Sequence, residues 1–474
     1  KNIKGDRTGS YPCPFIQGVW SIVKSAIDTG EVKILKPILN FSFEGYIKEK
    51  QLTKLGEELE GDRRSIKKAI RQAYLAQSKF YSSVKKRGKE ILSSLKDDEV
   101  AIVIVSRSYN SCDRVISMDV PRKLRELGFK VIPTDYLPVN SIDLSEEWPN
   151  LYWEFGDRIM SAVEIIKKDR RLYPVYITNF GCGPDSFILQ YFEREIDRPF
   201  LKLEVDEHSA GAGVITRCEA FIDSLMNVRN KKAPLSAQSK TNGKDAVFKK
   251  SHGRVIYIPY MGDGAVVLKH AFRSEGINAE MLYSDDETLK LGRKYTLGKE
   301  CYPFIITTGD IIKTLEHNDP KKVAFLMPQT YGPCRFGQYN KMQKIIIKEL
   351  GYEDVPIIAP GAPESTQFYR EYDMQGLRGF VLLMKAMCGI FTVDYLNKML
   401  RKTRPYEIEK GKANKVYQKY IEDVCQSVEN DPMSKTLNRM VHILRDARGD
   451  FENIPIKKTD RPLVGIVGEI FVRN

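Results

Sequence analysis

The sequence predicts an α/β protein with two Rossmann-like parallel-sheet domains and additional helical segments. Short apolar runs, such as 100–105 and 174–178, alternate with longer helical patterns. Strands that alternate with helices form parallel βαβ units in an open sheet. This alternation stops at a basic stretch, 229–253, and starts again after it. The length of 474 residues also exceeds one ordinary core and predicts two or three domains.

The first predicted α/β domain covers residues 1–228 and has a helical amino-terminal part. Residues 16–98 are expected to be mainly helical, with lysine-rich surfaces. The predicted strands that follow are 100–105, 130–133, 174–178 and 200–205. The predicted helices between them lie at 120–128, at 157–168 and after Pro184.

The second predicted α/β domain covers residues 254–365, and a helical segment, 366–474, follows it. Its predicted strands are 255–258, 279–282, 323–327 and 355–358. Its predicted helices run to Gly276, from 301 to 315 and from 338 to 350. Residues 366–449 are expected to be helical, and the apolar run 462–472 is expected to form a last strand.

The net charge of +13 permits an anionic partner without choosing one. Eight lysines and arginines but only one acid, Asp245, lie between Arg229 and Arg254. This stretch also contains proline, serine, asparagine and glycine, which predicts a solvated linker at 229–253. Phe248 is the only aromatic side chain there that could stack on a base, so nucleic acid is a weak candidate.

We expect a cytoplasmic protein without a membrane partner. No apolar run of membrane-spanning length stands out, and the first residues do not resemble a secretory signal. The eight cysteines lack the tight spacing of a disulfide framework, which favours reduced thiols.

Four cysteines form the most informative pattern in the chain. Cys13 and Cys301 each lie within two residues of a proline at the start of an apolar run. Cys182 and Cys334 lie in glycine-containing loops after predicted strands. A thiol on such a loop lies where open α/β sheets place their ligands, and glycine allows close backbone approach. The pattern favours a thiolate site for an inorganic cofactor.

A structural role for the cysteines remains open beside this interpretation. A lone buried cysteine usually serves as a small hydrophobic residue, as we expect for Cys218, Cys388 and Cys425. The chain has no Cys-x-x-Cys pair, so a zinc ribbon or finger is poorly supported. Widely dispersed loop cysteines fit better with a cluster that is assembled from separate strands.

Several ordered motifs resemble a known family. They are Asn-Phe-Gly-Cys-Gly-Pro-Asp at 179–185, Leu-Glu-Val-Asp-Glu-His-Ser at 203–209, Thr-Arg-Cys-Glu-Ala-Phe at 216–221, Glu-Cys-Tyr-Pro-Phe at 300–304, Gly-Pro-Cys-Arg-Phe-Gly at 332–337 and Pro-Leu-Val-Gly-Ile-Val-Gly-Glu-Ile at 462–470. Together they resemble the 2-hydroxyacyl-CoA dehydratase superfamily, and most closely its large activase-related members. The resemblance covers most of the chain.

The resemblance implies Rossmann-like domains that hold an oxygen-sensitive iron–sulfur cluster, of the [4Fe–4S] type or a larger variant. By this resemblance the ligands are Cys13, Cys182, Cys301 and Cys334, and Cys112 is an additional candidate. An ATP-hydrolysing activator would deliver low-potential electrons for the reduction or dehydration of an unknown substrate. The segment 360–365 is expected to match the Cys182 loop in the second half, without its cysteine.

Two departures from the family limit what the resemblance implies. The chain has no phosphate-binding Asp-x-Gly-Ser/Thr loop, so we expect ATP hydrolysis by a separate reductase. It also begins just before Cys13 and ends at Asn474, where the relatives continue, so we expect one subunit or a fragment. A further subunit or a homo-oligomer is expected among its partners. The alternative function is a cofactor-free two-domain scaffold or binding module that retains the fold. Whether the chain is itself an enzyme stays open.

Overall fold

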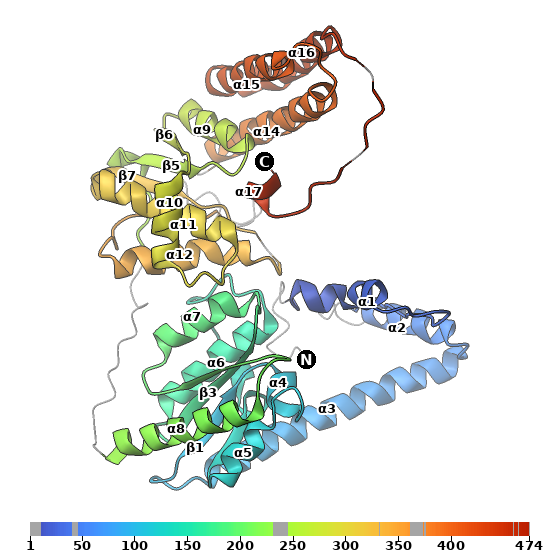
Figure 1. Cartoon of the computed structure of the whole chain (residues 1–474), viewed down its shortest axis with the longest axis vertical. Coiled ribbons are helices and arrows are strands. Elements are labelled where there is room, and N and C mark those ends of the chain that lie inside the picture. Colours follow the sequence, from blue (N-terminus) through green and yellow to red (C-terminus); the bar gives the residue numbers. More distant parts are fainter. Residues whose placement is uncertain are drawn as a thin grey trace. The chain divides into compact units, whose positions relative to one another are not determined.

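A computed structural model describes residues 11–39, 46–230, 245–330, 332–360, 373, 376–457, 459–462 and 464–473 (Figure 1). The chain divides into two compact units. Unit 1 comprises Lys1–Asn242 together with Tyr331–Gly337, and unit 2 comprises Gly243–Thr330 and Gln338–Asn474. Each unit contains one four-stranded parallel sheet, which confirms the predicted fold class.

The sheet of unit 1 has the strand order β2-β1-β3-β4. Its strands are β1 (Ala101–Val105), β2 (Lys130–Pro133), β3 (Leu172–Asn179) and β4 (Leu201–Val205). Val103 of β1 is in register with Ile132 of β2 and with Pro174 of β3. All five residues of β1 are buried, because helices cover both faces of a parallel sheet.

Helices cover this sheet in two layers. One core cluster joins β1, β3 and β4 to α5 (Val120–Glu126) and α8 (Gly211–Asn230). The helices α6 (Glu154–Lys168) and α7 (Asp185–Glu195) precede and follow β3 and pack against each other. Figure 1 shows α5 and α8 in front of the strands and α6 and α7 behind them. The predicted helix at 157–168 is therefore confirmed, with a start three residues earlier.

The predicted helical amino-terminal part is also confirmed. It consists of α1 (Pro14–Ala26), α2 (Tyr46–Glu58) and α3 (Arg63–Ser93). Asp62 caps α3 because its carboxylate accepts hydrogen bonds from the amides of Arg64 and Ser65. Gly88 allows the end of α3 to pack tightly, since a Cβ there would clash with the carbonyl oxygen of Tyr136.

Unit 2 repeats the same topology with the strand order β6-β5-β7-β8. Its strands are β5 (Val255–Pro259), β6 (Ala279–Leu282), β7 (Val323–Leu326) and β8 (Ile357–Ile358). Its helices are α9 (Gly264–Ser274), α10 (Asp286–Tyr295), α11 (Tyr302–His317), α12 (Tyr339–Glu349), α14 (Leu377–Thr403), α15 (Lys412–Asn430), α16 (Met433–Glu452) and α17 (Ile470–Arg473). A core cluster joins the sheet to α9, α14, α15 and α16.

Helix α14 comes closer to a membrane span than the sequence analysis expected. It is long and apolar enough to cross a membrane by length and composition alone. Nine of its residues are buried, and it packs against α9, α15 and α16. One helix of this kind is weak evidence for a membrane span, because a core helix of a soluble protein passes the same test.

Two predicted boundaries differ from the structure. The apolar run 462–472 forms no strand in its described residues, and its end is the short helix α17. An apolar run becomes a strand only where a sheet edge pairs with it, and Val464, Ile466 and Val467 are instead exposed.

The predicted linker 229–253 is shorter on its carboxyl side, because Phe248 is buried in the core of unit 2. Residues 231–244 of that linker lie outside the described residues.

Candidate thiol site

The predicted cysteine loops of unit 1 lie at the carboxyl edge of its sheet. β1 and β3 are the central strands of this sheet. From β1 the chain continues to β2 at one edge, and from β3 it continues to β4 at the other edge, so the direction of the strand order reverses between β1 and β3. This switch point is where open α/β sheets bind their ligands. The chain after β1 carries Arg107 and Cys112, and the chain after β3 carries Cys182.

Cys182 lies in a tight turn between β3 and α7. Its amide donates a hydrogen bond to the carbonyl oxygen of Asn179 at 3.1 Å. Gly181 has φ +67°, a left-handed conformation that favours glycine. The amide of Ser186 donates to the carbonyl oxygen of Cys182 at 3.2 Å. The turn therefore fixes the backbone around a half-buried, free thiol.

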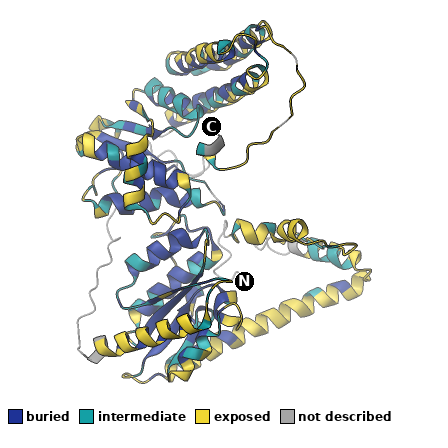
Figure 2. Cartoon of the chain, viewed as in Figure 1, coloured by how far each residue is buried: buried dark blue, intermediate teal, exposed yellow. Residues whose placement is uncertain are grey.

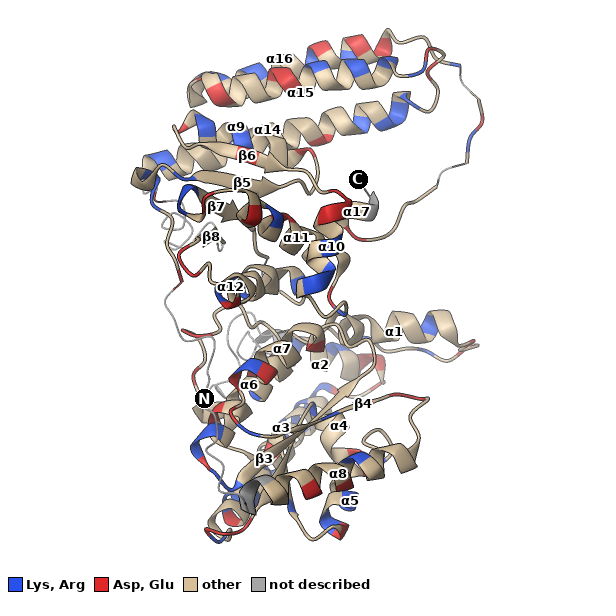
Figure 3. Cartoon of the chain, turned by 60° about the vertical axis from the view of Figure 1, so that its left-hand side comes forward, with Lys and Arg blue, Asp and Glu red and all other residues tan. Residues whose placement is uncertain are grey.

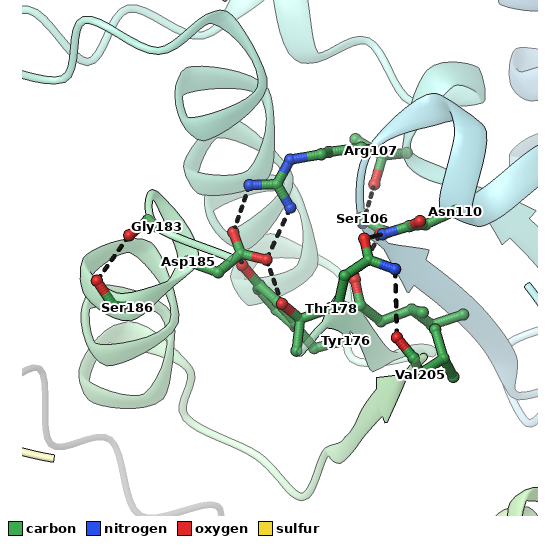
Figure 4. Close-up of polar contacts among 12 residues, drawn as sticks. Ser106, Arg107, Asn110, Tyr176, Thr178, Gly183, Asp185, Ser186 and Val205 are labelled. Atoms are coloured by element: carbon green, nitrogen blue, oxygen red, sulfur yellow. Dashed lines mark hydrogen bonds and ion pairs between the residues drawn. The ribbon is translucent and has the colours of Figure 1, made fainter. Parts of the chain in front are cut away.

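A buried ion pair holds Asp185, the first residue of α7, three positions after Cys182 (Figure 4). The two terminal guanidinium nitrogens of Arg107 donate to the two carboxylate oxygens of Asp185, each at 2.7 Å. The hydroxyls of Tyr176 and Thr178 also donate to this carboxylate. Burial alone would lower the pKa of Arg107, but the Asp185 carboxylate raises it well above its usual value. The guanidinium is therefore a permanent positive charge beneath the loop.

Cys13 reaches the same part of unit 1 from the amino terminus. It is the N-cap residue of α1, and its side chain makes no capping hydrogen bond. The backbone just before it forms a parallel bridge, in which the amide of Tyr11 donates to the carbonyl oxygen of Tyr152 at 2.7 Å. The amide of Glu154 donates to Tyr11 in return, at 3.4 Å. This bridge places Cys13 beside the start of α6.

The thiol groups of Cys13 and Cys182 are close enough to influence each other electrostatically. Burial raises the pKa of Cys182 to about 11. The Asp185 carboxylate adds to this increase, the Arg107 guanidinium opposes it, and a Cys13 thiolate would raise the pKa further. The same two sulfurs also raise the pKa of Tyr109, where burial is the main cause. Two thiolates this close would repel each other, and a cation bound between them would offset this repulsion.

The loop that carries Cys334 belongs to unit 1 as well. The indole nitrogen of Trp153 donates to the carbonyl oxygen of Pro333 at 2.9 Å. The guanidinium of Arg335 donates to the Ser186 hydroxyl at 3.2 Å, and its Cδ lies 3.6 Å from where a Cβ of Gly183 would stand. Cys334 itself is exposed. Three of the four predicted ligands therefore belong to unit 1.

The other two candidates have different surroundings. Cys112 is exposed at the end of the short helix α4 (Ser108–Cys112), and its sulfur lies 3.9 Å from a carboxylate oxygen of Asp135. Burial raises the pKa of Cys112, although its hydrogen bond with Ser111 acts to lower this pKa. Cys301 belongs to unit 2, where it is the N-cap residue of α11 and its sulfur lies 2.5 Å from the hydroxyl of Tyr339.

The repeated topology corrects one correspondence between the two halves. β7 occupies the position in its sheet that β3 occupies in the other, so the loop with Cys334 is the counterpart of the loop with Cys182. The segment 360–365 follows β8 and corresponds to the chain after β4, and its residues 361–365 lie outside the described residues. Cys13 and Cys301 share only a local context, because each is the N-cap residue of a helix whose first turn contains proline.

Several site residues were not singled out from the sequence. Arg107, Tyr109 and Trp153 surround the thiol loops, and Tyr176 and Thr178 hold Asp185 from within β3. The sequence did offer a sign of the role of Arg107, because a charged residue closely follows a predicted buried strand there. The aromatic residues carried no signal, because aromatic side chains in apolar runs usually belong to the core.

Unit 2 has a cavity at its own switch point, between the ends of β5 and β7. Its volume is about 440 Å³, and its walls include Met261, Gly262, Asp263, Pro328 and Asn397. The hydroxyls of Tyr260 and Tyr417 both donate to the carboxylate of Asp263. A cavity of this size with fixed polar groups can hold a small molecule.

Another group of potential metal ligands lies after β4. One oxygen or nitrogen from each of Asp206, Glu207 and His208 lies within 4.8 Å of the others. The carboxylate of Asp206 instead accepts hydrogen bonds from the amide of His208 and the hydroxyl of Ser209. These contacts give Asp206 a local structural role in the loop after β4.

Comparison with known proteins finds a similar family for part of the chain. Residues 1–137 match the family described as the CoA enzyme activase uncharacterised domain (DUF2229). The match contains α1 to α3, β1, β2, Cys13 and Cys112. No curated protein and no solved structure matches the chain significantly. The amino-terminal part is therefore similar to a CoA enzyme activase-related domain, which is consistent with the resemblance to activase-related proteins.

Proposed function

We propose that this chain is an iron–sulfur component of a CoA-ester enzyme system. In this proposal an ATP-hydrolysing activator supplies low-potential electrons, and the chain uses them to reduce or dehydrate an unknown substrate in the cytoplasm. Cys13, Cys182, Cys301 and Cys334 are the proposed ligands of a [4Fe–4S] or larger cluster, with Cys112 as an additional candidate. The main support is that two free, half-buried thiols, Cys13 and Cys182, lie near enough to interact electrostatically, with Cys182 in the loop at the switch point of a Rossmann-like sheet.

The surroundings of the thiols fit such a group. A cluster would supply one-electron redox chemistry at this edge of the sheet. Thiolates and sulfides carry negative charge, and the Arg107 guanidinium provides a fixed positive charge near Cys182. Gly181 and Gly183 leave the backbone beside the thiol free of side chains, so amide groups can approach a ligand closely.

Each supporting residue has a defined task in this proposal. Asp185 holds Arg107 in place through the bidentate contact, and Tyr176 and Thr178 hold Asp185. Trp153 positions the Cys334 loop through the carbonyl of Pro333. Deprotonation of Cys182 is opposed by burial, so binding of iron must release a proton from this thiol near neutral pH.

Anaerobic iron and sulfide analysis tests the proposal. The purified or reconstituted chain should be brown and should bleach in air. Replacement of Cys13 or Cys182 by alanine should lower the iron content, because an iron would lose its thiolate ligand. Cys388→Ala is the matched control, since this cysteine lies in the core helix α14 and should leave the iron content unchanged.

The alternative proposal is a cofactor-free binding module. The cavity beside Asp263 in unit 2 favours it, because a ligand could bind there without any contribution from cysteine. A colourless chain without iron or sulfide after anaerobic reconstitution would favour this alternative.

A further inference from the structure

Helix α3 carries an unusual concentration of positive charge. Its 31 residues, Arg63–Ser93, contain one acid, Glu90, and ten basic residues. These are Arg63, Arg64, Lys67, Lys68, Arg71, Lys79, Lys85, Lys86, Arg87 and Lys89. All ten are exposed, and Figure 2 shows α3 as an exposed arm along most of its length. A helix of this length extends about 46 Å.

Most of this charge is uncompensated. Arg63 forms an ion pair with Glu57, and Arg87 forms one with Glu90. The other eight basic side chains have no ion-pair partner within the described part of the chain. With about 100° between successive helical residues, these eight lie within a sector of about 120°. We call this sector, with its eight basic residues, the basic face of α3.

The packing of α3 leaves the basic face in solvent. Ile66, Val84 and Gly88 are its buried residues, and they lie on the other side of the helix. Gly88 approaches the backbone of Tyr136, which fixes one end of α3 to unit 1. Leu75 lies on the basic face and is 53% exposed. The basic face is therefore exposed to solvent on a helix that is anchored at one end, and it contains apolar as well as charged side chains.

A second exposed surface lies on α1, the helix that begins directly after Cys13. Figure 1 shows α1 and α3 as parts of the same amino-terminal arm. None of the residues of α1 is buried. Its exposed apolar side chains include Phe15, Val19 and Trp20, of which Phe15 is 73% exposed. Apolar surface with charged surroundings is typical of a protein–protein interface rather than of a free monomer surface.

We propose that the arm formed by α1 to α3 is the docking surface for an acidic face of the ATP-hydrolysing activator. This inference rests on the proposed function, which supplies the partner. The basic face would attract the partner over a distance, and the apolar side chains of α1 would make the close contact. Because α1 starts at Cys13, a partner bound to the arm lies near the thiol that would receive its electrons.

The surface favours a protein over the other anionic partners. Bound nucleic acid would leave most of the exposed apolar surface of α1 in solvent, whereas a protein partner would bury this surface. A membrane would also accept a basic and apolar arm. The match of residues 1–137 to a CoA enzyme activase family covers the whole arm and favours the activator.

The test compares two variants with the same change in charge. In the first, Lys67→Glu, Lys68→Glu and Arg71→Glu reverse the charge of part of the basic face. In the control, Lys435→Glu, Arg439→Glu and Arg445→Glu change three exposed residues of α16 in unit 2. Acidic and basic residues are mixed in the last part of α16, from Arg445 to Glu452 (Figure 3). Glutamate and lysine have similar helix propensity, so both variants should fold, as circular dichroism can verify.

Binding of the purified activator is measured by sedimentation and biosensor kinetics, without reductant. At about 50 mM salt, the α3 variant should associate at least about tenfold more slowly than wild type, and the control should not. The difference should shrink at about 0.5 M salt, where charges are screened within a few ångströms. Equal association of both variants with the activator overturns the proposal.

Two further measurements separate this proposal from its alternatives. Labelled DNA and RNA, and vesicles that contain anionic lipid, are offered to the wild-type chain. Tight binding to any of these through the basic face, without binding of the activator, overturns the proposal. Iron content is measured separately on the same preparations. A chain that binds the activator through α3 but holds no iron contradicts the proposed cluster and leaves the docking surface supported.

Discussion

The indole nitrogen of Trp153 donates a hydrogen bond of 2.9 Å to the carbonyl oxygen of Pro333, which precedes Cys334. The backbone of the same tryptophan forms the parallel bridge to Tyr11, two residues before Cys13. One residue of unit 1 therefore holds two segments that are more than 300 residues apart, and each segment carries a candidate cysteine. Trp153 is also the N-cap residue of α6, which fixes it to the sheet.

Replacement of Trp153 by phenylalanine should loosen the Cys334 loop. The aromatic ring is kept, but the carbonyl oxygen of Pro333 loses its donor, which costs about 0.5–1.5 kcal/mol locally. Amides of residues 335–337 should then exchange hydrogen about two- to tenfold faster in mass spectrometry. Amides of β1 serve as the internal control, and unchanged exchange in the loop would show that Trp153 does not hold it.

The thiol of Cys182 should react slowly with iodoacetamide in the cluster-free chain. Its pKa is raised to about 11, so about one molecule in a thousand carries the thiolate at pH 8. Labelling of Cys182 should therefore accelerate about tenfold for each pH unit between pH 7 and 10. Peptide mapping would check this, with the exposed Cys334 as a comparison. Rapid labelling of Cys182 at pH 7 would contradict its assigned environment.

The alternation of apolar runs and helical patterns was enough to predict both sheets. The buried strand β1 and the helix α6 follow directly from it, because strands in parallel sheets are apolar on both faces. The last predicted strand failed for a physical reason. An apolar pattern does not show whether a neighbouring strand is present to accept its hydrogen bonds, and the described residues of 462–472 have none.

The thiol site was predictable only in part. The glycines around Cys182 and the prolines after Cys13 and Cys301 gave local signals in the sequence. The partners of these segments come from far along the chain, so their spacing in sequence carries no information. The contact between Trp153 and Pro333 joins residues 180 positions apart, and no local pattern predicts it.

Loss of the buried ion pair beneath the thiol loop should strongly destabilise unit 1. Asp185→Ala leaves the buried guanidinium of Arg107 without its carboxylate, which should cost about 3–5 kcal/mol of unfolding free energy. Glu193→Ala removes a partly exposed ion pair with Lys202 and should cost less than about 1 kcal/mol. Denaturant unfolding followed by tryptophan fluorescence measures both. Similar losses in the two variants would show that the buried pair has no special role.

Asp310 in unit 2 should make the stability of α11 depend on pH. Its side chain is buried and accepts a hydrogen bond from the Ser284 hydroxyl at 2.8 Å. Burial raises its pKa to about 6 from an ordinary value of 3.8. Because the folded state binds the proton more tightly than the unfolded state, the protonated carboxyl favours folding at low pH. This advantage is lost as the pH rises through about 6.

Asp310→Asn should therefore stabilise unit 2 at pH 8 and have little effect near pH 4. A shift of about two pKa units corresponds to at most about 3 kcal/mol, and the neutral amide can still accept the hydrogen bond from Ser284. Asp285→Asn is the control with the opposite sign, because Lys313 lowers the pKa of Asp285 to about 2. Its carboxylate favours the folded state above its ordinary pKa, so its loss should destabilise the unit at pH 8. Hydrogen exchange of α11 peptides at both pH values measures these effects, and equal behaviour of Asp310→Asn at pH 4 and pH 8 would contradict the assigned burial.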